Sequence, residues 1–248
     1  RYYALFSALV YLTTMPVLRH GRLAMLDGAT LCFQILLFLF LLKTRRNLRW
    51  ALPSGICLAL ICLTKGWMMG VLLGAIALIF ILWDTPRLLK SLYLWAGIIL
   101  GTTPVVAWYL AQYNHYGEQF IDTTMKQQSV ERIFTAVEGH QGPIWYYILE
   151  LLKYPHPWIF IALWGIKSAW QHRNLGWGKF VLVNISFYLV AVSLMGTKLP
   201  WYIMPIYPSL SLAAGVALGE TKYLPASITY PKPWTIFFSL LSIGTIAG

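Results

Sequence analysis

Long apolar segments dominate this 248-residue chain and constrain its fold more than any other feature. Several approach the roughly 20 residues that an α-helix needs to cross the hydrocarbon core of a bilayer. In lipid the backbone must satisfy its own hydrogen bonds, which favours helices. Charged residues form only 11% of the chain, well below the share of a typical soluble domain. The sequence therefore predicts an all-α, polytopic membrane protein with apolar segments at about residues 3–18, 23–42, 50–64, 67–83, 91–110, 144–166, 179–195, 200–219 and 234–248.

The ends of the chain fall inside apolar segments, and the first residue is Arg1 rather than Met. We therefore expect residues 1–248 to be one transmembrane domain truncated at both ends, an internal piece of a longer protein. The segments at 50–64 and 67–83 are short, so they are predicted to tilt or to stop short of one interface. Residues 111–143 are predicted to form a long external loop, because connections of this length are usually functional.

Basic residues predict the orientation in the membrane. If the segments alternate, one set of loops carries eleven basic residues against two acids, and the other carries seven against six. The positive-inside rule assigns the first set to the cytoplasm. Topology thus accounts for most of the net charge of +11, and no basic patch remains to indicate nucleic-acid binding. The first set comprises Lys43, Arg45, Arg46, Arg49, Arg87, Lys90, Lys167, Arg173, Lys179, Lys222 and Lys232.

Four polar features then fall on the external side: Asp27, Lys65 with Gly66, residues 111–143, and the segment that begins at Lys198. Ionisable groups at membrane helix ends often mark functional sites. We therefore predict one extracytoplasmic site built from helix ends and a long loop. A structural alternative stays open for each charge, since Asp27 could cap a helix and Lys65 could be a solvated lysine in a turn.

Residues 197–208 place a lysine, several aromatics and three prolines at the start of an apolar helix. Prolines at 200, 205 and 208 interrupt the first turns and free carbonyl groups, which only protein or a wet cavity can satisfy. The segment is predicted to line a cavity. An interfacial anchor is the alternative, because Trp, Tyr and Lys also gather at membrane surfaces.

Five motifs, taken in order, carry a resemblance to a known family: Arg22–Asp27, Leu63–Gly66, Gln128–Phe134, Gly142–Tyr147 and Lys198–Pro208. Together they resemble the membrane glycosyltransferases related to protein O-mannosyltransferases. Within that family they are most similar to the bacterial branch that includes the lipid A aminoarabinose transferase. The resemblance covers about residues 10 to 220, and its last motif is the most specific.

The resemblance implies a transmembrane helical bundle of the GT-C type in the plasma (inner) membrane. Such an enzyme moves a sugar from a polyprenyl-phosphate donor to a lipid, glycan or protein acceptor outside the cytoplasm. Lys65, Arg132 and Lys198 are the candidate cations for the leaving phosphate, which gains negative charge during transfer. Tyr202 is expected to donate a further hydrogen bond to that phosphate. Asp27 matches an acidic position of the family and is the candidate catalytic carboxylate.

Two departures from the family pattern limit what the chain can do alone. The family's principal catalytic aspartate, and an acidic-basic-proline motif soon after it, would precede residue 1, so the fragment is expected to be inactive by itself. Some members bind a divalent metal through histidines near the long loop, where this chain has Gln127 and Gln128. No metal ligand or cofactor is therefore assigned, and dependence on a divalent metal stays open.

Two other classes of function use similar sequence features. A transporter or channel also uses charged helix mouths and broken helices, but it predicts ionisable residues near the bilayer midplane. A non-catalytic envelope scaffold is the other alternative. Apart from Glu150 and Lys153, near the start of an apolar segment, no ionisable residue lies deep in a predicted span.

Overall fold

The computed structural model describes residues 2–23, 25–124, 142–221 and 239. These residues form helices without any strand, which confirms the predicted all-α class. The α-helices are α1 (Tyr2–Thr13), α2 (Met15–Gly21), α3 (Asp27–Lys43), α4 (Ala51–Lys65), α5 (Trp67–Asp84), α6 (Leu92–Tyr116), α7 (Glu118–Ile121), α9 (Tyr146–Lys153), α10 (Trp158–Gln171), α11 (Gly176–Leu194) and α12 (Tyr207–Glu220). Short 3₁₀ helices are η1 (Leu48–Trp50), η2 (Pro86–Lys90) and η5 (Pro200–Ile206).

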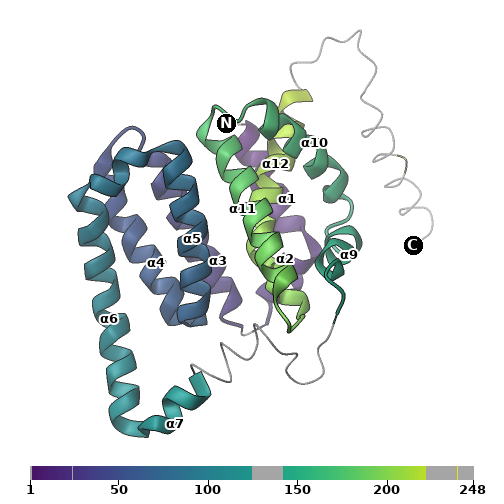
Figure 1. The fold of residues 1–248 in the computed structure, drawn as a ribbon. Coiled ribbons are helices and arrows are strands. Elements are labelled where there is room, and N and C mark those ends of the chain that lie inside the picture. The colour runs from purple at the N-terminus through teal and green to yellow at the C-terminus, as the bar shows by residue number, and fades with distance from the viewer. Residues whose placement is uncertain (1, 24, 125–141, 222–238, 240–248) are drawn as a thin grey trace.

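Five helical stretches of the described chain are long and apolar enough to cross a membrane. They differ in how far the protein itself covers them. In the 18-residue window used to identify each stretch, 83% of the residues are buried in the stretch formed by η5 and α12, but only 17% in α6. The α12 helix is therefore central to the bundle and α6 lies at its edge, as Figure 1 shows. The stretches are Leu48–Lys65, Trp67–Asp84, Leu92–Tyr116, Gly176–Leu194 and Pro200–Glu220.

Several predicted segments differ from the observed helices. The segment at 3–18 is divided into α1 and α2 at Thr14, just before Pro16. The segment at 144–166 is divided into α9 and α10 by residues 154–157, where two prolines lack the N–H that a continuous helix needs. Within the predicted loop at 111–143, α6 continues to Tyr116 and α7 follows it, while residues 125–141 lie outside the described structure.

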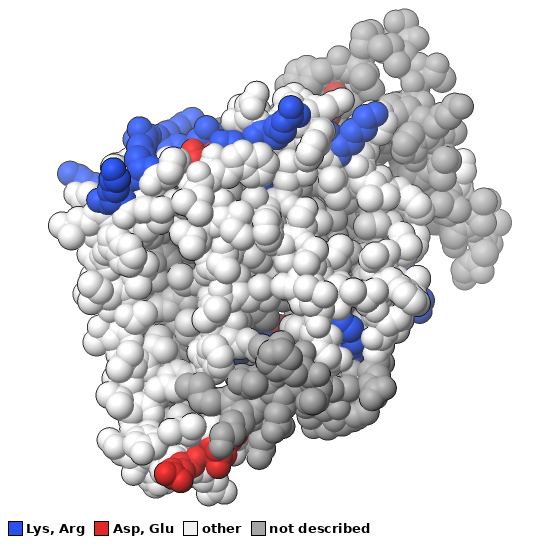
Figure 2. All heavy atoms as spheres, in the orientation of Figure 1, with Lys and Arg blue, Asp and Glu red and all other residues white. Residues whose placement is uncertain are grey.

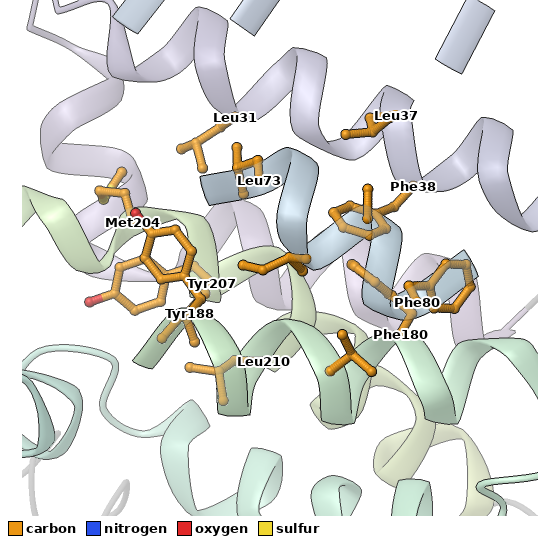
Figure 3. Packing of buried hydrophobic residues seen from close by; sticks show 14 of the residues in the cluster. Leu31, Leu37, Phe38, Leu73, Phe80, Phe180, Tyr188, Met204, Tyr207 and Leu210 are labelled. Atoms are coloured by element: carbon orange, nitrogen blue, oxygen red, sulfur yellow. The ribbon is translucent and has the colours of Figure 1, made fainter. Parts of the chain in front are cut away.

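One large apolar core joins the helices on either side of α11. Phe38 of α3 packs against Phe180 of α11, with ring centroids 4.4 Å apart, and against Phe80 of α5 at 6.0 Å. Figure 3 shows these rings toward one end of a group of buried side chains and Tyr188 and Tyr207 toward the other, so that α3, α5, α11 and α12 contribute to the same core. This core fixes the spacing between α5 and α11.

The loops segregate to two ends of the bundle, as the alternating topology predicts. The loops after α3, α5 and α10 lie at one end, and the turns after α4 and α6 lie at the other (Figure 1). Figure 2 shows Lys and Arg side chains along the first end and acidic side chains at the far end of α6. We call these the basic end and the outer end. At the basic end, buried Asp84 pairs with Arg45 (3.4 Å) and Lys179 (3.1 Å).

Candidate functional site

A cavity of about 620 Å³ lies between α5 and α11 toward the outer end of the bundle. Its volume falls within the range of ligand pockets, roughly 300–1,000 Å³. Polar side chains at its outer part give way to apolar walls along the two helices. It is lined by Leu26, Thr64, Lys65, Met68, Met69, Val71, Leu72, Ala75, Tyr188, Ala191, Val192, Met195, Trp201 and Tyr202.

Asp27 and Lys65 form a close ion pair at this cavity. Asp27 is the first residue of α3 and Lys65 is the last residue of α4, and Lys65 Nζ lies 2.6 Å from each carboxylate oxygen of Asp27. The Asp27 side chain is 9% exposed and the Lys65 side chain 21% exposed. Thr30 and Thr64 join the same two helices through a 3.1 Å contact between their hydroxyls. The two charges therefore act as one unit.

This pairing bears on the structural alternatives for both residues. The N-cap of α3 is Leu26, without a side-chain cap, so Asp27 lies in the first turn, where the helix dipole favours a negative charge. Both of its oxygens nevertheless contact Lys65. Lys65 is thus neither an isolated solvated lysine nor remote from the cavity.

Gly66 makes the sharp reversal that brings α5 back beside α4. Its φ of 88° and ψ of 168° lie in a region that is essentially restricted to glycine. The residue ends α4 directly after Lys65 and precedes Trp67, the first residue of α5. The reversal keeps Lys65 at the mouth of the cavity while α5 forms the cavity wall.

The 3₁₀ helix η5 carries Tyr202 to the cavity and is held by buried polar side chains. Tyr202 is 8% exposed, and its carbonyl accepts a hydrogen bond from the Tyr188 hydroxyl (2.9 Å). The carbonyl of Pro205 accepts from Gln34 Nε2 (2.8 Å) and Asn184 Nδ2 (3.0 Å). Protein groups thus satisfy carbonyls in the proline-interrupted turn, as the sequence predicted.

Sequence reasoning missed Gln34, Asn184 and Tyr188 as parts of this arrangement. Each is at most 1% exposed, although each lies in an apolar helix. An amide or hydroxyl inside such a helix is costly without a partner. That cost is the signal that could have identified them. Asn184 also donates to Ser209 Oγ at 2.8 Å.

Lys198 lies beside the cavity rather than among its lining residues. Its side chain is buried, and Nζ donates to the carbonyls of Val192 (3.2 Å) and Ser193 (2.5 Å) in the last turn of α11. The ammonium also sits 5.5 Å from the ring centroid of Tyr147. Desolvation by burial lowers the pKa of Lys198. The buried state of Lys198 and Tyr202 disfavours the interfacial-anchor alternative.

The structure thus brings together Asp27, Lys65 and Tyr202, with Lys198 close behind the end of α11. Arg132 lies outside the described residues, as do Gln127 and Gln128. Within the described chain, no group of three or more His, Cys, Asp and Glu side chains is arranged to hold a metal ion.

The described chain is a polytopic helical bundle with the GT-C fold, and the largely apolar cavity lies toward its outer end. Its fold is that of ArnT from Cupriavidus metallidurans, both bound to undecaprenyl phosphate (TM-score 0.77) and in the apo state (TM-score 0.76). Each match is 20% identical in sequence and covers 100% of this chain, but only 45% and 44% of the respective ArnT chain.

Curated relatives give the same result at the level of sequence. The chain is 28% identical over 236 residues to undecaprenyl phosphate-alpha-4-amino-4-deoxy-L-arabinose arabinosyl transferase 1 of Pseudomonas fluorescens, a match that covers 89% of this chain and 42% of the relative. It is 27% identical over 218 residues to the transferase of the same name from Erwinia tasmaniensis, covering 84% of this chain and 39% of that relative. No family model matches the chain. The predicted resemblance is confirmed, and the chain spans less than half the length of these relatives.

Proposed function

We propose that this chain is the membrane-embedded part of a polyprenyl-phosphate-dependent glycosyltransferase of the inner membrane. It would take a sugar, in the first instance a pentose, from the lipid-linked donor and pass it to a lipid, glycan or protein acceptor on the extracytoplasmic side. The observation that carries this proposal is the cavity between α5 and α11, which has Lys65 and Tyr202 at its polar part and apolar walls beyond. A phosphate attached to an isoprenoid chain has the same division into a charged head and an apolar tail.

The residues at the mouth have the chemistry that this transfer requires. A lysine ammonium has three N–H donors, and two contacts from Lys65 go to Asp27. One donor therefore remains for an oxygen of the leaving phosphate, whose growing negative charge a preorganised cation stabilises. We assign a further hydrogen bond to Tyr202 and a second cation to Arg132.

Asp27 has two roles in this proposal. Its carboxylate fixes the direction of the Lys65 ammonium, and it can receive a proton from, or orient, the acceptor. Lys198 is best placed to act indirectly, because its bonds to Val192 and Ser193 hold the end of α11, which forms part of the cavity wall. A direct contact from Lys198 to the donor phosphate stays a prediction.

A transporter is less well supported by the described spans. Their charged residues lie at or near the ends of the stretches, at Arg49, Lys65, Asp84, Lys179 and Glu220. A translocation path would be expected to place ionisable groups near the midplane. A non-catalytic scaffold, for its part, gives no reason for the Asp27–Lys65 pair to face a cavity.

The proposal is tested with the full-length protein in proteoliposomes. Radiolabelled undecaprenyl phosphate-4-amino-4-deoxy-L-arabinose is supplied with lipid, glycan and protein acceptors, and transfer of label is measured. We expect transfer by the wild type, strong loss in Lys65→Met, and normal transfer in the matched control Lys90→Met, since Lys90 is an exposed lysine at the basic end. Solute flux without sugar transfer would favour a transporter. The absence of both flux and transfer, with this donor and with other polyprenyl-linked sugars, would favour a scaffold.

A further inference from the structure

A second cavity lies between α5 and α11, nearer the basic end of the bundle. Its volume is about 510 Å³, and its walls are almost entirely apolar, with Ile79 and Leu82 from α5 and Leu182 and Phe187 from α11. Leu82 and Phe187 are 55% and 48% exposed, so this inner groove opens sideways from the bundle. The described chain leaves that side of the groove uncovered.

Two tryptophans border the inner groove, and a cation accompanies each. Lys179 Nζ lies 6.0 Å from the ring centroid of Trp83 and donates to its carbonyl at 3.1 Å. The Arg173 guanidinium lies 5.4 Å from the ring centroid of Trp170 and donates to the Trp170 carbonyl at 3.2 Å. Both tryptophans line the groove and are 43% and 61% exposed. Tryptophan rings of this kind mark the level of the lipid headgroups.

Positive charge exceeds negative charge around this border. Asp84 is the acidic residue paired there, and its carboxylate is shared by Arg45 and Lys179. Within the described part of the chain, Arg173 forms no ion pair with a carboxylate, so it adds a further positive charge beside the groove. Figure 2 shows that Lys and Arg side chains continue along this end of the molecule. An apolar groove below a basic border is complementary to a lipid that joins a fatty chain to an anionic headgroup.

We propose that the inner groove binds one anionic phospholipid, with an acyl chain between α5 and α11 and its phosphate at Arg173 and Lys179. The site is separate from the outer cavity, since the two share no lining residue. Its position between the same two helices would let a bound lipid support their spacing. The proposal does not depend on glycosyl transfer.

The test measures the lipids that remain with the full-length protein after gentle purification from mixed phosphatidylethanolamine and phosphatidylglycerol bilayers, by native mass spectrometry. We expect selective retention of phosphatidylglycerol. Arg173→Gln should weaken it about fivefold, the effect of removing roughly 1 kcal/mol of attraction per basic residue. The control Lys90→Gln, an exposed lysine of the same end, should retain the lipid.

A second pair of variants tests the groove itself. Ser186 lines it, so Ser186→Trp should fill the space and release the lipid. Val190, one turn further along α11, is 57% exposed and lines neither cavity, so Val190→Trp should leave the bound lipid in place. The proposal would be overturned if the wild type retained both phospholipids equally, or if Ser186→Trp retained as much lipid as the wild type. It would also be overturned if the lipid that Ser186→Trp releases were a polyprenyl phosphate.

Discussion

The Asp27–Lys65 pair is the residue-level feature on which the proposed chemistry depends most. Both residues are recognisable as candidates in the sequence, but their contact is not, because 38 positions separate them and only the α3–α4 packing brings them together. The same limit applies to Tyr202, which was selected from its motif, and to its support by Tyr188. A pattern along the chain identifies chemical types, whereas the partners follow from tertiary packing.

Asp27→Asn should strongly reduce sugar transfer by the full-length protein while folding and membrane insertion stay normal. The change is nearly isosteric and removes the negative charge that holds Lys65. If the pair acts as a unit, Lys65→Met and the double variant should show losses similar to that of Asp27→Asn, so the effects should be far from additive. The measurement is the transfer rate of the wild type, the two single variants and the double variant, which together form a double-mutant cycle. Transfer at the wild-type rate in Asp27→Asn would show that the Asp27 charge is not needed for transfer and that the residue has a purely structural role.

Lys198→Ala tests whether a buried lysine acts on the donor or on the helix. Loss of its bonds leaves the carbonyls of Val192 and Ser193 without that donor, so the thermal unfolding temperature should fall along with transfer. A direct phosphate contact instead predicts a drop of about 10²-fold in turnover with an unchanged unfolding temperature, the scale for removing one preorganised donor. Thermal unfolding and transfer are measured on the same preparation.

At the scale of elements, the sequence predicted the helical class and most spans but not every helix boundary. Apolar runs do not show where a helix breaks, so the segment at 144–166 was read as one span although its two prolines divide α9 from α10. The prolines of 200–208 were more informative, because they predicted carbonyls in need of partners. The partners themselves, Gln34 and Asn184, come from α3 and α11 and were not predicted.

Gly66→Ala should destabilise the protein and disturb the outer cavity. The added Cβ would meet no atom within 4 Å, so the cost arises from the backbone conformation alone, about 1–3 kcal/mol. Gly28→Ala is the matched control, since its added Cβ also meets nothing within 4 Å and its φ lies outside the positive range. Denaturation in detergent compares the two variants. Equal stability would show that the α4–α5 reversal tolerates a side chain.

Asn184→Leu should cost about 1–3 kcal/mol of stability, because it leaves buried polar groups short of a partner. Asn184 is fully buried, and its amide bonds both the Pro205 carbonyl and Ser209. Thr103→Val is the control, since that exposed hydroxyl bonds only within its own helix, to the Ile99 carbonyl. A loss in Asn184→Leu no larger than in the control would mean that η5 does not depend on this network.

At the scale of the whole molecule, the charge pattern and the helix directions agree. Alternation of the helices places the connection between α3 and α4 at the basic end and α7 at the outer end (Figure 1). Asn47 belongs to that connection, and Glu118 is the first residue of α7. The positive-inside rule then puts the cavity with Lys65 on the extracytoplasmic side. This arrangement was predictable from sequence because loop charge depends on composition and order rather than on packing.

Cysteine labelling in spheroplasts tests that orientation in the full-length protein. Both Asn47 and Glu118 are exposed, so a cysteine at either position is accessible to reagent on its own side of the membrane. Glu118→Cys should react with an impermeant thiol reagent in intact spheroplasts, and Asn47→Cys should react only after permeabilisation. The background is a variant in which Cys32, Cys57 and Cys62 are replaced by serine or alanine, since Cys32 is exposed on the bundle. The opposite labelling pattern would place the cavity mouth in the cytoplasm, where transfer to an external acceptor could not occur.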